Sequence, residues 1–293
     1  MDSLHHIPIS IANILIELTS PLSAAELGIE QRLGPFFGAT EKPLRRVALG
    51  WAESLSAPDP QGDLIYDPGS IWRMYRLGQD YTAVLTYQSE DQPAQAQSVL
   101  RARPAWDDLA LTEQRYAASW QSLINIGAGE LILRTAILFT GGLVFHSSGL
   151  DDNGKGIVFL GHSGAGKSTQ VGLWSQQPGV IAMNDDRIAV QVEAGGPKCY
   201  GTPWGGTADI ARNHAAPLVA LIVLEHAPDN AIQLLAPAMA APLLLARAFL
   251  PYWDCSLMRR AMENLNALLA RVPVYRLRCR PEPGVIPLVR SVL

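Results

Sequence analysis

The stretch Gly156–Ser168 reads Gly-Ile-Val-Phe-Leu-Gly-His-Ser-Gly-Ala-Gly-Lys-Ser and decides the fold. Its apolar run, Ile157–Leu160, has the length and composition of a buried strand. The following residues, Gly161–Ser168, match the phosphate-binding loop G-x-x-x-x-G-K-[ST] in full. The chain after the loop, up to Trp174, is compatible with a helix. A strand, a glycine-rich loop and a helix in this order direct backbone N–H groups and a helix dipole at one anionic group.

The residue types of this loop indicate its chemistry. Glycines let the backbone close around phosphate oxygens, Lys167 neutralises the β and γ phosphates, and the Ser168 hydroxyl can ligate Mg²⁺. We therefore expect ATP and Mg²⁺ as cofactors, with Lys167 also catalytic. The predicted ATP-binding residues are Gly161, His162, Ser163, Gly164, Ala165, Gly166, Lys167, Ser168 and Thr169. The alternative interpretation is a glycine-rich turn that binds nothing.

An acidic pair follows at the end of a second apolar run. Val180–Met183 leads into Asn184-Asp185-Asp186-Arg187, where P-loop proteins present a carboxylate to magnesium. One acid is enough for the metal, so the other is available to take a proton from an attacking hydroxyl. We predict that Asp185 and Asp186 divide these two roles, with Ser168 as a further metal ligand. The sequence does not assign the roles, and the alternative is an exposed acidic turn.

The segment before the loop argues against the common mononucleotide-binding folds. Leu143–Phe145 begins an apolar strand, and the tight-turn dipeptide Asn153-Gly154 joins it to the strand that precedes the loop. Two strands joined in this way are antiparallel, whereas a doubly wound parallel sheet needs a crossover between neighbouring strands. The sequence thus predicts a mixed α/β (α+β) protein that is neither Ras-like nor adenylate-kinase-like.

Four segments together resemble the HPr kinase and phosphoenolpyruvate carboxykinase group, especially the HPr-kinase-like proteins of peptide-modification (lasso peptide) gene clusters. The segments are His146–Gly149, Gly161–Ser168, Asn184–Arg187 and Pro273–Leu277. The resemblance implies a PEP-carboxykinase-like P-loop kinase domain with an N-terminal β-rich accessory domain. It also implies that His146 lies near the metal and the phosphates as a catalytic residue. Self-association is expected by the same resemblance, because HPr kinases form rings.

The chain departs from HPr kinases proper at two places. Thr169 stands where those enzymes have a glutamate, and Tyr200–Thr207 replaces their glutamate-containing signature. These differences disfavour HPr as the substrate and disfavour a reverse phosphorylase activity. Within the replaced segment, Trp204 is either a ligand contact or a buried residue of a tight turn. Further phosphate contacts or solvated side chains are expected at Arg212, Arg247, Arg259 and Arg260.

Two domains are expected from the length of the chain and from the change in its pattern of predicted strands and helices. Residues 1–125 are predicted to form a β-rich accessory domain, with one or two helices near its start and a small antiparallel sheet that includes Tyr81–Tyr87. Helices are predicted over Thr112–Ile124 and Ala128–Thr140. Residues 126–293 are predicted to form the ATP-binding catalytic domain. The aromatic residues Trp72, Tyr75, Tyr81 and Tyr87 are either a peptide-recognition surface or core.

The composition narrows the class of protein. The 293 residues are 48% apolar and 17% charged, which excludes intrinsic disorder as the main state. The formal net charge of -4 provides no overall positive electrostatic field to attract a nucleic-acid backbone, so nucleic acid is not expected as a partner. No apolar run is long enough for a membrane span, and the N-terminus lacks a secretory signal, so a cytoplasmic protein is expected. The three cysteines lack metal-binding spacing and are expected to be reduced and buried.

The main functional prediction is an ATP- and Mg²⁺-dependent kinase that transfers the γ-phosphate to a hydroxyl. The expected acceptor is a serine of a peptide or protein, as in precursor peptide modification. One alternative is a non-catalytic ATP-binding regulator or assembly partner, which needs a single acid for Mg²⁺ and no base. The other is a kinase of a small metabolite.

Overall fold

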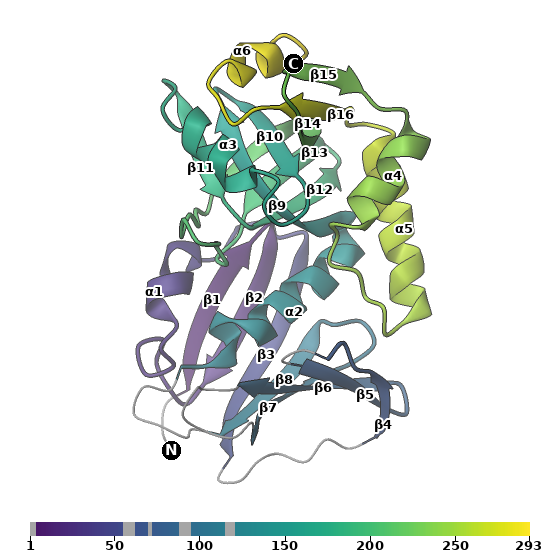
Figure 1. Cartoon of the computed structure of the whole chain (residues 1–293). Helices are drawn as coiled ribbons and strands as arrows, with labels where there is room; N and C mark the ends of the chain where they lie inside the picture. Colours follow the sequence, from purple (N-terminus) through teal and green to yellow (C-terminus); the bar gives the residue numbers. More distant parts are fainter. Residues whose placement is uncertain (1–3, 55–61, 70–71, 88–94, 115–120) are drawn as a thin grey trace. The chain divides into compact units, whose positions relative to one another are not determined.

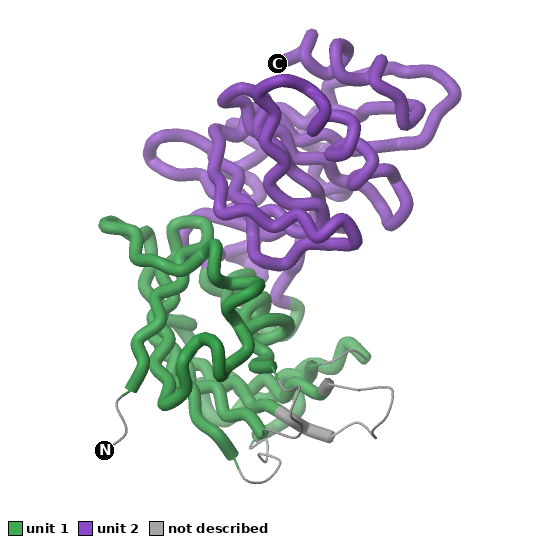
Figure 2. Tube along the Cα trace, turned by 90° about the vertical axis from the view of Figure 1, so that its left-hand side faces the viewer, with its two compact units in different colours: residues 1–136, 252–255 green, residues 137–251, 256–293 purple. Residues whose placement is uncertain are grey.

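The computed structural model describes residues 4–54, 62–69, 72–87, 95–114 and 121–293. The chain divides into two compact units (Figure 2). The first contains residues 1–136 and 252–255, and the second contains residues 137–251 and 256–293. The boundary therefore falls after the helix that was expected to open the second domain, and a short later segment returns to the first unit. Both units are mixed α/β with a large mixed sheet.

The first unit is built on an eight-stranded sheet of order β1-β2-β3-β8-β7-β6-β5-β4. Its strands are β1 His5–Ile11, β2 Ile14–Ser20, β3 Arg45–Ser54, β4 Asp63–Tyr66, β5 Trp72–Leu77, β6 Asp80–Tyr87, β7 Gln95–Ala102 and β8 Asp108–Gln114. Its helices are α1 Glu30–Leu33, η1 Gly34–Phe36, η2 Leu123–Asn125 and α2 Gly127–Ala136. The sheet is larger than expected and not purely antiparallel, since β3 pairs in parallel with both β2 and β8.

One expectation for this unit is incomplete and another is wrong. The helices expected near its start are present as α1 and η1, but they follow a hairpin that was not expected. The N-terminus forms the β1–β2 hairpin, because Ile7, Ile9 and Ile11 alternate inward and Ala12–Asn13 turn with positive φ. The helix expected over Thr112–Ile124 is wrong at its start, because Thr112–Gln114 is the end of β8. Residues 115–120 lie outside the described residues, and Leu123 and Ile124 are helical as part of η2. Leu109, Leu111 and Glu113 alternate into the interior of the unit, which is the period of a strand.

Glu113 is a fully buried carboxylate that links three parts of this unit. It accepts hydrogen bonds from the Trp51 indole N–H, from the Ser98 hydroxyl at 2.9 Å and from the Leu123 N–H at 2.7 Å. Burial is the largest effect on its pKa and raises it, while these donors oppose the shift. The polar partners explain why a charged residue is tolerated inside the sheet.

Aromatic residues of the first unit pack mainly against one another. Trp253 lies 5.4 Å from Trp72 in an edge-to-face arrangement, and Trp106 lies 5.9 Å from Tyr81. Tyr81 is 5% exposed, and its hydroxyl donates to Asp254 at 2.8 Å. Segment 252–255 is thereby attached to the first unit. Of the aromatic residues considered for recognition, Tyr81 belongs to the core, Trp72 and Tyr75 are partly exposed, and the side chain of Tyr87 lies outside the described residues.

The second unit carries the glycine-rich loop on a sheet of order β10-β9-β12-β13-β14-β16-β15 (Figure 1). Its strands are β9 Gly142–Asp152, β10 Lys155–Leu160, β11 Val180–Asn184, β12 Arg187–Glu193, β13 Gly196–Gly201, β14 Ala215–His226, β15 Ala231–Leu234 and β16 Val274–Cys279. Its helices are η3 Ile137–Thr140, α3 Lys167–Trp174, α4 Pro237–Leu245, α5 Cys255–Leu269 and α6 Val285–Arg290. Strand β11 pairs with β9 outside the main order.

The predicted hairpin before the loop is confirmed. Strands β9 and β10 are antiparallel, and Asn153 and Gly154 turn with φ of 53° and 89°. On its other side β10 pairs in parallel with β14, which pairs in parallel with β16. The carboxyl ends of these three parallel strands therefore meet at one edge of the sheet, which is where α/β proteins commonly bind ligands.

The remaining expectations for the described residues are mixed. The helix predicted over Ala128–Thr140 is present as α2 and the short helix η3. Cys199 and Cys279 are buried as expected, but Cys255 is exposed at the start of α5. Among the described residues, no helix combines the length and apolar character needed to cross a membrane.

Candidate functional site

The glycine-rich loop has a conformation that its glycines make accessible. It connects β10 to α3, with Gly166 as the N-cap residue of the helix. Gly164 and Gly166 have φ of +79° and +93°, which residues with a Cβ rarely adopt. At Gly161 an added Cβ would lie only 2.6 Å from the Cβ of Ala165. Glycine is therefore required at these three positions of the loop, by positive φ at Gly164 and Gly166 and by close packing at Gly161.

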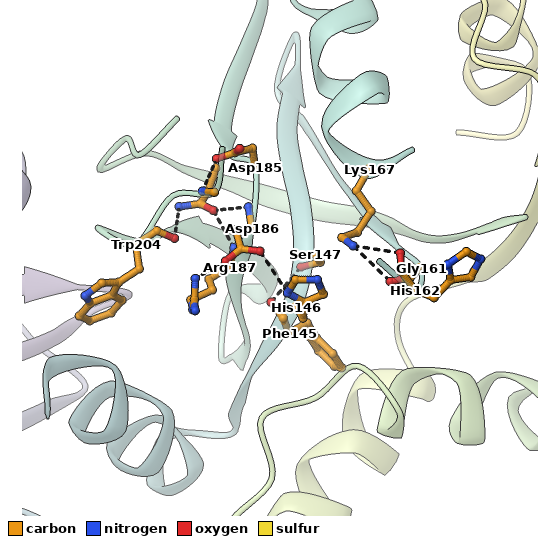
Figure 3. A network of polar contacts seen from close by, with 12 residues as sticks. Phe145, His146, Ser147, Gly161, His162, Lys167, Asp185, Asp186, Arg187 and Trp204 are labelled. Atoms are coloured by element: carbon orange, nitrogen blue, oxygen red, sulfur yellow. Dashed lines mark hydrogen bonds and ion pairs between the residues drawn. The ribbon is translucent and has the colours of Figure 1, made fainter. Parts of the chain in front are cut away.

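Lys167 is folded back over the loop (Figure 3). Its Nζ donates to the carbonyl oxygens of Gly161 and His162, each at 3.3 Å, and the residue is 7% exposed. Burial lowers the pKa of Lys167, the charge of Asp186 opposes this shift, and the charge of Arg247 adds to it. An ammonium group held by two neutral carbonyls in a largely buried position is well placed to pair with an incoming anion.

Asp185 anchors a second loop of the same unit. Its Oδ1 accepts from the backbone N–H groups of Gly206 at 2.7 Å and Ile210 at 3.3 Å, and its Oδ2 accepts from that of Ala208 at 2.8 Å. The residue is 2% exposed. Both carboxylate oxygens are therefore used within the protein. We infer that Asp185 shapes the segment 205–210, which separates its role from that of its neighbour.

The glycine pair of this second loop is explained by the same contact. A Cβ on Gly205 would lie 3.2 Å from Asp185 Oδ1, and a Cβ on Gly206 would lie 2.9 Å from Asp185 Oδ2. The close approach expected of these glycines is therefore an approach to an internal carboxylate. The indole of Trp204 is 2% exposed and points away from Lys167 (Figure 3). This position favours the buried-turn interpretation of Trp204.

Asn184 is a functional candidate that the sequence reasoning missed. Its side chain is fully buried, and its Oδ1 accepts from the backbone N–H groups of Asp186 and Arg187 at 2.7 and 2.6 Å. Its Nδ2 donates to the carbonyl oxygens of Thr202 and Trp204 at 2.9 and 3.1 Å. One amide therefore fixes both the acidic turn and the start of the glycine loop. An Asn directly before the acids, a residue type that favours such turns, was the available signal.

Asp186 is the acid that lies on the same side as Lys167 and His146 (Figure 3). Its Oδ1 lies 3.1 Å from Nδ1 of His146, and its Oδ2 is paired with the Arg187 guanidinium. The hydrogen bond from His146 is the largest effect that lowers the pKa of Asp186, burial opposes it, and the charges of Arg187 and Lys167 lower the pKa further. Because the ionised carboxylate only accepts, Nδ1 of His146 carries the proton.

These residues surround a cleft of about 570 Å³ within the second unit. The cleft is lined by His146, Ser163, Gly164, Gly166, Lys167, Ser168, Thr169, Asp185, Asp186, Gly206 and Thr207. Ser168 and Thr169 are exposed in the first turn of α3. Of the predicted loop residues, Gly161, His162 and Ala165 do not line the cleft, and the His162 ring instead lies 2.6 Å from the Ser163 carbonyl oxygen.

The four arginines proposed as phosphate contacts have different environments. Arg247 follows α4 on a segment that pairs with β9, where its carbonyl accepts from the His146 N–H at 2.8 Å. Its charge lowers the pKa of Lys167, and its backbone contacts His146, which lines the cleft. Arg260 stacks over the Phe139 ring at 4.6 Å, while Arg212 and Arg259 are exposed. The structure therefore supports Arg247 as a candidate and gives the others no comparable contact with site residues.

The oxygen donors of the cleft suit a Mg²⁺ ion that is also held by substrate phosphates, and they do not form a site in which protein side chains alone hold the metal. Within the described residues, no group of three His, Cys, Asp or Glu side chains is arranged to hold a metal ion. Magnesium is commonly bound by one or two protein oxygens together with substrate phosphates and water. The Ser168 hydroxyl and the Asp186 carboxylate are hard oxygen donors of this kind.

Comparison with known proteins adds no relative to this description. No protein-family model matches the chain, and no curated protein matches it in sequence. The functional argument therefore depends on the geometry of the cleft.

Proposed function

We propose that this protein is an ATP- and Mg²⁺-dependent kinase with a PEP-carboxykinase-like, HPr-kinase-like catalytic unit. It transfers the γ-phosphate to a hydroxyl, with a serine of a peptide or protein as the acceptor. The single observation that carries the proposal is the contact of 3.1 Å between His146 Nδ1 and Asp186 Oδ1 in a cleft that also contains Lys167. A histidine paired with a carboxylate beside the lysine of a glycine-rich loop suits phosphoryl transfer to a hydroxyl, because it places a proton acceptor next to a cation that can pair with phosphate.

Each residue has a defined part in this proposal. The loop N–H groups and Lys167 bind the triphosphate, and Ser168 and Asp186 would hold Mg²⁺, which neutralises charge on the phosphates when bound. Since Nδ1 of His146 donates to Asp186, Nε2 is the nitrogen that accepts the proton of the acceptor hydroxyl. The acceptor oxygen forms the new bond to phosphorus, the bond to the β-phosphate oxygen breaks, and ADP leaves.

A non-catalytic ATP-binding regulator is the second candidate, and a specific observation favours it. Two adjacent acids favoured catalysis because one could bind Mg²⁺ and the other could act as the base. The Asp185 carboxylate instead accepts hydrogen bonds from three backbone N–H groups, so it is not available for either role. Asp186 is the remaining acid, because its side chain is 19% exposed although it contacts His146 and Arg187, and a binder needs only one acid. The distinction between a kinase and a binder therefore depends on His146, which a protein that only binds ATP does not need as a base.

The test combines labelled ATP with candidate acceptors. The purified protein is incubated with γ-labelled ATP, Mg²⁺ and serine-containing peptides, and labelled peptide is measured alongside ATP affinity. We expect label transfer that falls at least a hundredfold in His146→Gln while ATP affinity stays within about threefold, as for loss of a general base. Glu263→Gln, at an exposed position of α5, is the control. ATP binding without transfer to any acceptor would support the regulator, and transfer only to small hydroxyl compounds would support a metabolite kinase.

A further inference from the structure

His226 lies beside the glycine-rich loop at the carboxyl end of a neighbouring parallel strand. Strand β14 ends at His226, and it pairs in parallel with β10, from which the loop emerges. The His226 ring contacts the loop directly, because its Nε2 lies 2.9 Å from the Gly164 carbonyl oxygen. A carbonyl only accepts, so Nε2 carries the proton. Sequence reasoning gave no role to this residue.

The His226 side chain is both held in place and open to solvent. Its Cε1 is 3.9 Å from the position that a Cβ on Gly166 would occupy, so the ring packs along the loop. The residue is exposed. Within the part of the chain that the structure describes, Nδ1 has no hydrogen-bond partner. An oriented aromatic ring with an open face is therefore presented at the edge of the phosphate-binding loop.

The two sides of β10 suggest the direction of a bound triphosphate. Strand β9, on one side, carries His146, and its contact with Asp186 marks the end where the γ-phosphate reacts. Strand β14, on the other side, carries His226. A nucleotide whose γ-phosphate faces Asp186 must extend its nucleoside away from that side. The carboxyl ends of the parallel strands β14 and β16 are the surface in that direction.

We propose that His226 contacts the nucleoside of the bound nucleotide, with its open imidazole face stacked on the base. This inference rests on the proposed ATP binding and concerns the part of the ligand that the phosphate loop does not reach. Base stacking on aromatic side chains tolerates different bases, so the contact is expected to act on any nucleotide. Inorganic polyphosphate has no base to stack, and the contact therefore increases the affinity for nucleotides relative to polyphosphate. The hydrogen bond to Gly164 fixes the ring plane in advance.

The test compares ATP with inorganic tripolyphosphate, which has the phosphates but no nucleoside. Dissociation constants for both ligands are measured with Mg²⁺ by calorimetry for the wild-type protein, His226→Ala and His226→Phe. We expect His226→Ala to weaken ATP about tenfold, as for loss of one stacking contact, and tripolyphosphate less than twofold. His226→Phe retains the stacking face and should bind ATP within about threefold of wild type. His5→Ala, at an exposed position in the first unit, is the control.

Four outcomes would overturn the inference. Equal weakening of both ligands in His226→Ala means that the ring acts only through the Gly164 carbonyl. Unchanged ATP affinity means that there is no contact, and a wild-type protein that prefers tripolyphosphate to ATP has no nucleoside site. ATP binding with the expected His226 effects but no phosphoryl transfer refutes the kinase proposal and leaves this inference intact, whereas absence of binding to either ligand refutes both.

Discussion

The assignment of Asp185 as a loop anchor makes the sharpest prediction. In Asp185→Asn, one oxygen remains to accept from Gly206 and Ile210, but an amide NH₂ faces the N–H of Ala208, which Asp185 binds at 2.8 Å. A hydrogen bond to a charged group contributes about 1.5–3 kcal/mol, and the Ala208 N–H left facing another donor costs about 1 kcal/mol more, the low end for an unsatisfied donor because Ala208 is exposed. Because the loop can relax, we expect the free energy of unfolding, or of local loop opening, to fall by about 2–4 kcal/mol.

Two measurements report this loss. Urea unfolding gives the global free energy, and trypsin cleavage after Arg212, an exposed residue just beyond the loop, gives the opening of segment 205–210. A local loss of 2–4 kcal/mol should raise the cleavage rate by about thirtyfold to several hundredfold. Asp209→Asn is the matched control, because it removes the same charge at an exposed position of the same loop.

One result would refute this account of Asp185. If Asp185→Asn leaves both the urea midpoint and the cleavage rate at Arg212 unchanged while it abolishes Mg²⁺-dependent ATP binding, Asp185 acts on the ligand and does not anchor the loop. Asp186→Asn should show the opposite pattern, with label transfer lost and cleavage at Arg212 close to wild type.

Two further predictions concern buried charges. Lys167→Met should abolish tripolyphosphate binding and raise the urea midpoint of the ligand-free protein, because burial disfavours the Lys167 ammonium; a lowered midpoint would contradict this. Arg290→Ala should lower the free energy of unfolding at pH 7 by about 1–3 kcal/mol, because it leaves the Asp152 carboxylate, bonded twice by Arg290 at 2.8 Å, without its cation. Arg290 lowers the pKa of Asp152 below its ordinary 3.8, so this stabilisation is present above pH 3.8 and lost as pH falls through the lowered value. In urea titrations the difference between wild type and variant should therefore be full at pH 7 and should shrink as the pH falls below 3.8.

Local sequence signals predicted the parts of the fold that depend on neighbouring residues. The hairpin turn at Asn153-Gly154 and the loop Gly161–Ser168 were both predicted from residue types that tolerate positive φ, and both are present. The β1–β2 hairpin was missed because its turn, Ala12-Asn13, lacks glycine. The end of strand β8, Thr112–Gln114, was mistaken for the start of a helix because its inward position 113 is a glutamate, whose partners come from other strands and from residue 123.

The division of roles between the two acids was beyond the reach of the sequence. On a strand end, Asp185 and Asp186 are equivalent candidates, and only contacts with residues more than twenty positions later separate them. The importance of Asn184 likewise depends on distant residues just before that segment, since it donates to Thr202 and Trp204. His226 was missed for a comparable reason, because it meets Gly164 only through the pairing of β14 with β10.

Two glycine-rich segments, 205–210 and 161–168, contribute to the cleft. In the segment 205–210, glycines allow backbone N–H groups to converge on an anion, and the anion is the protein's own Asp185. In the loop 161–168, glycines again give the backbone freedom to curl, and the helix start and Lys167 face the same cleft. A glycine-rich segment in a sequence therefore indicates anion binding without indicating whether the anion is internal or external. What separates the two loops here is the presence of a carboxylate already bound in one of them, and a phosphate is the anion that we propose for the other.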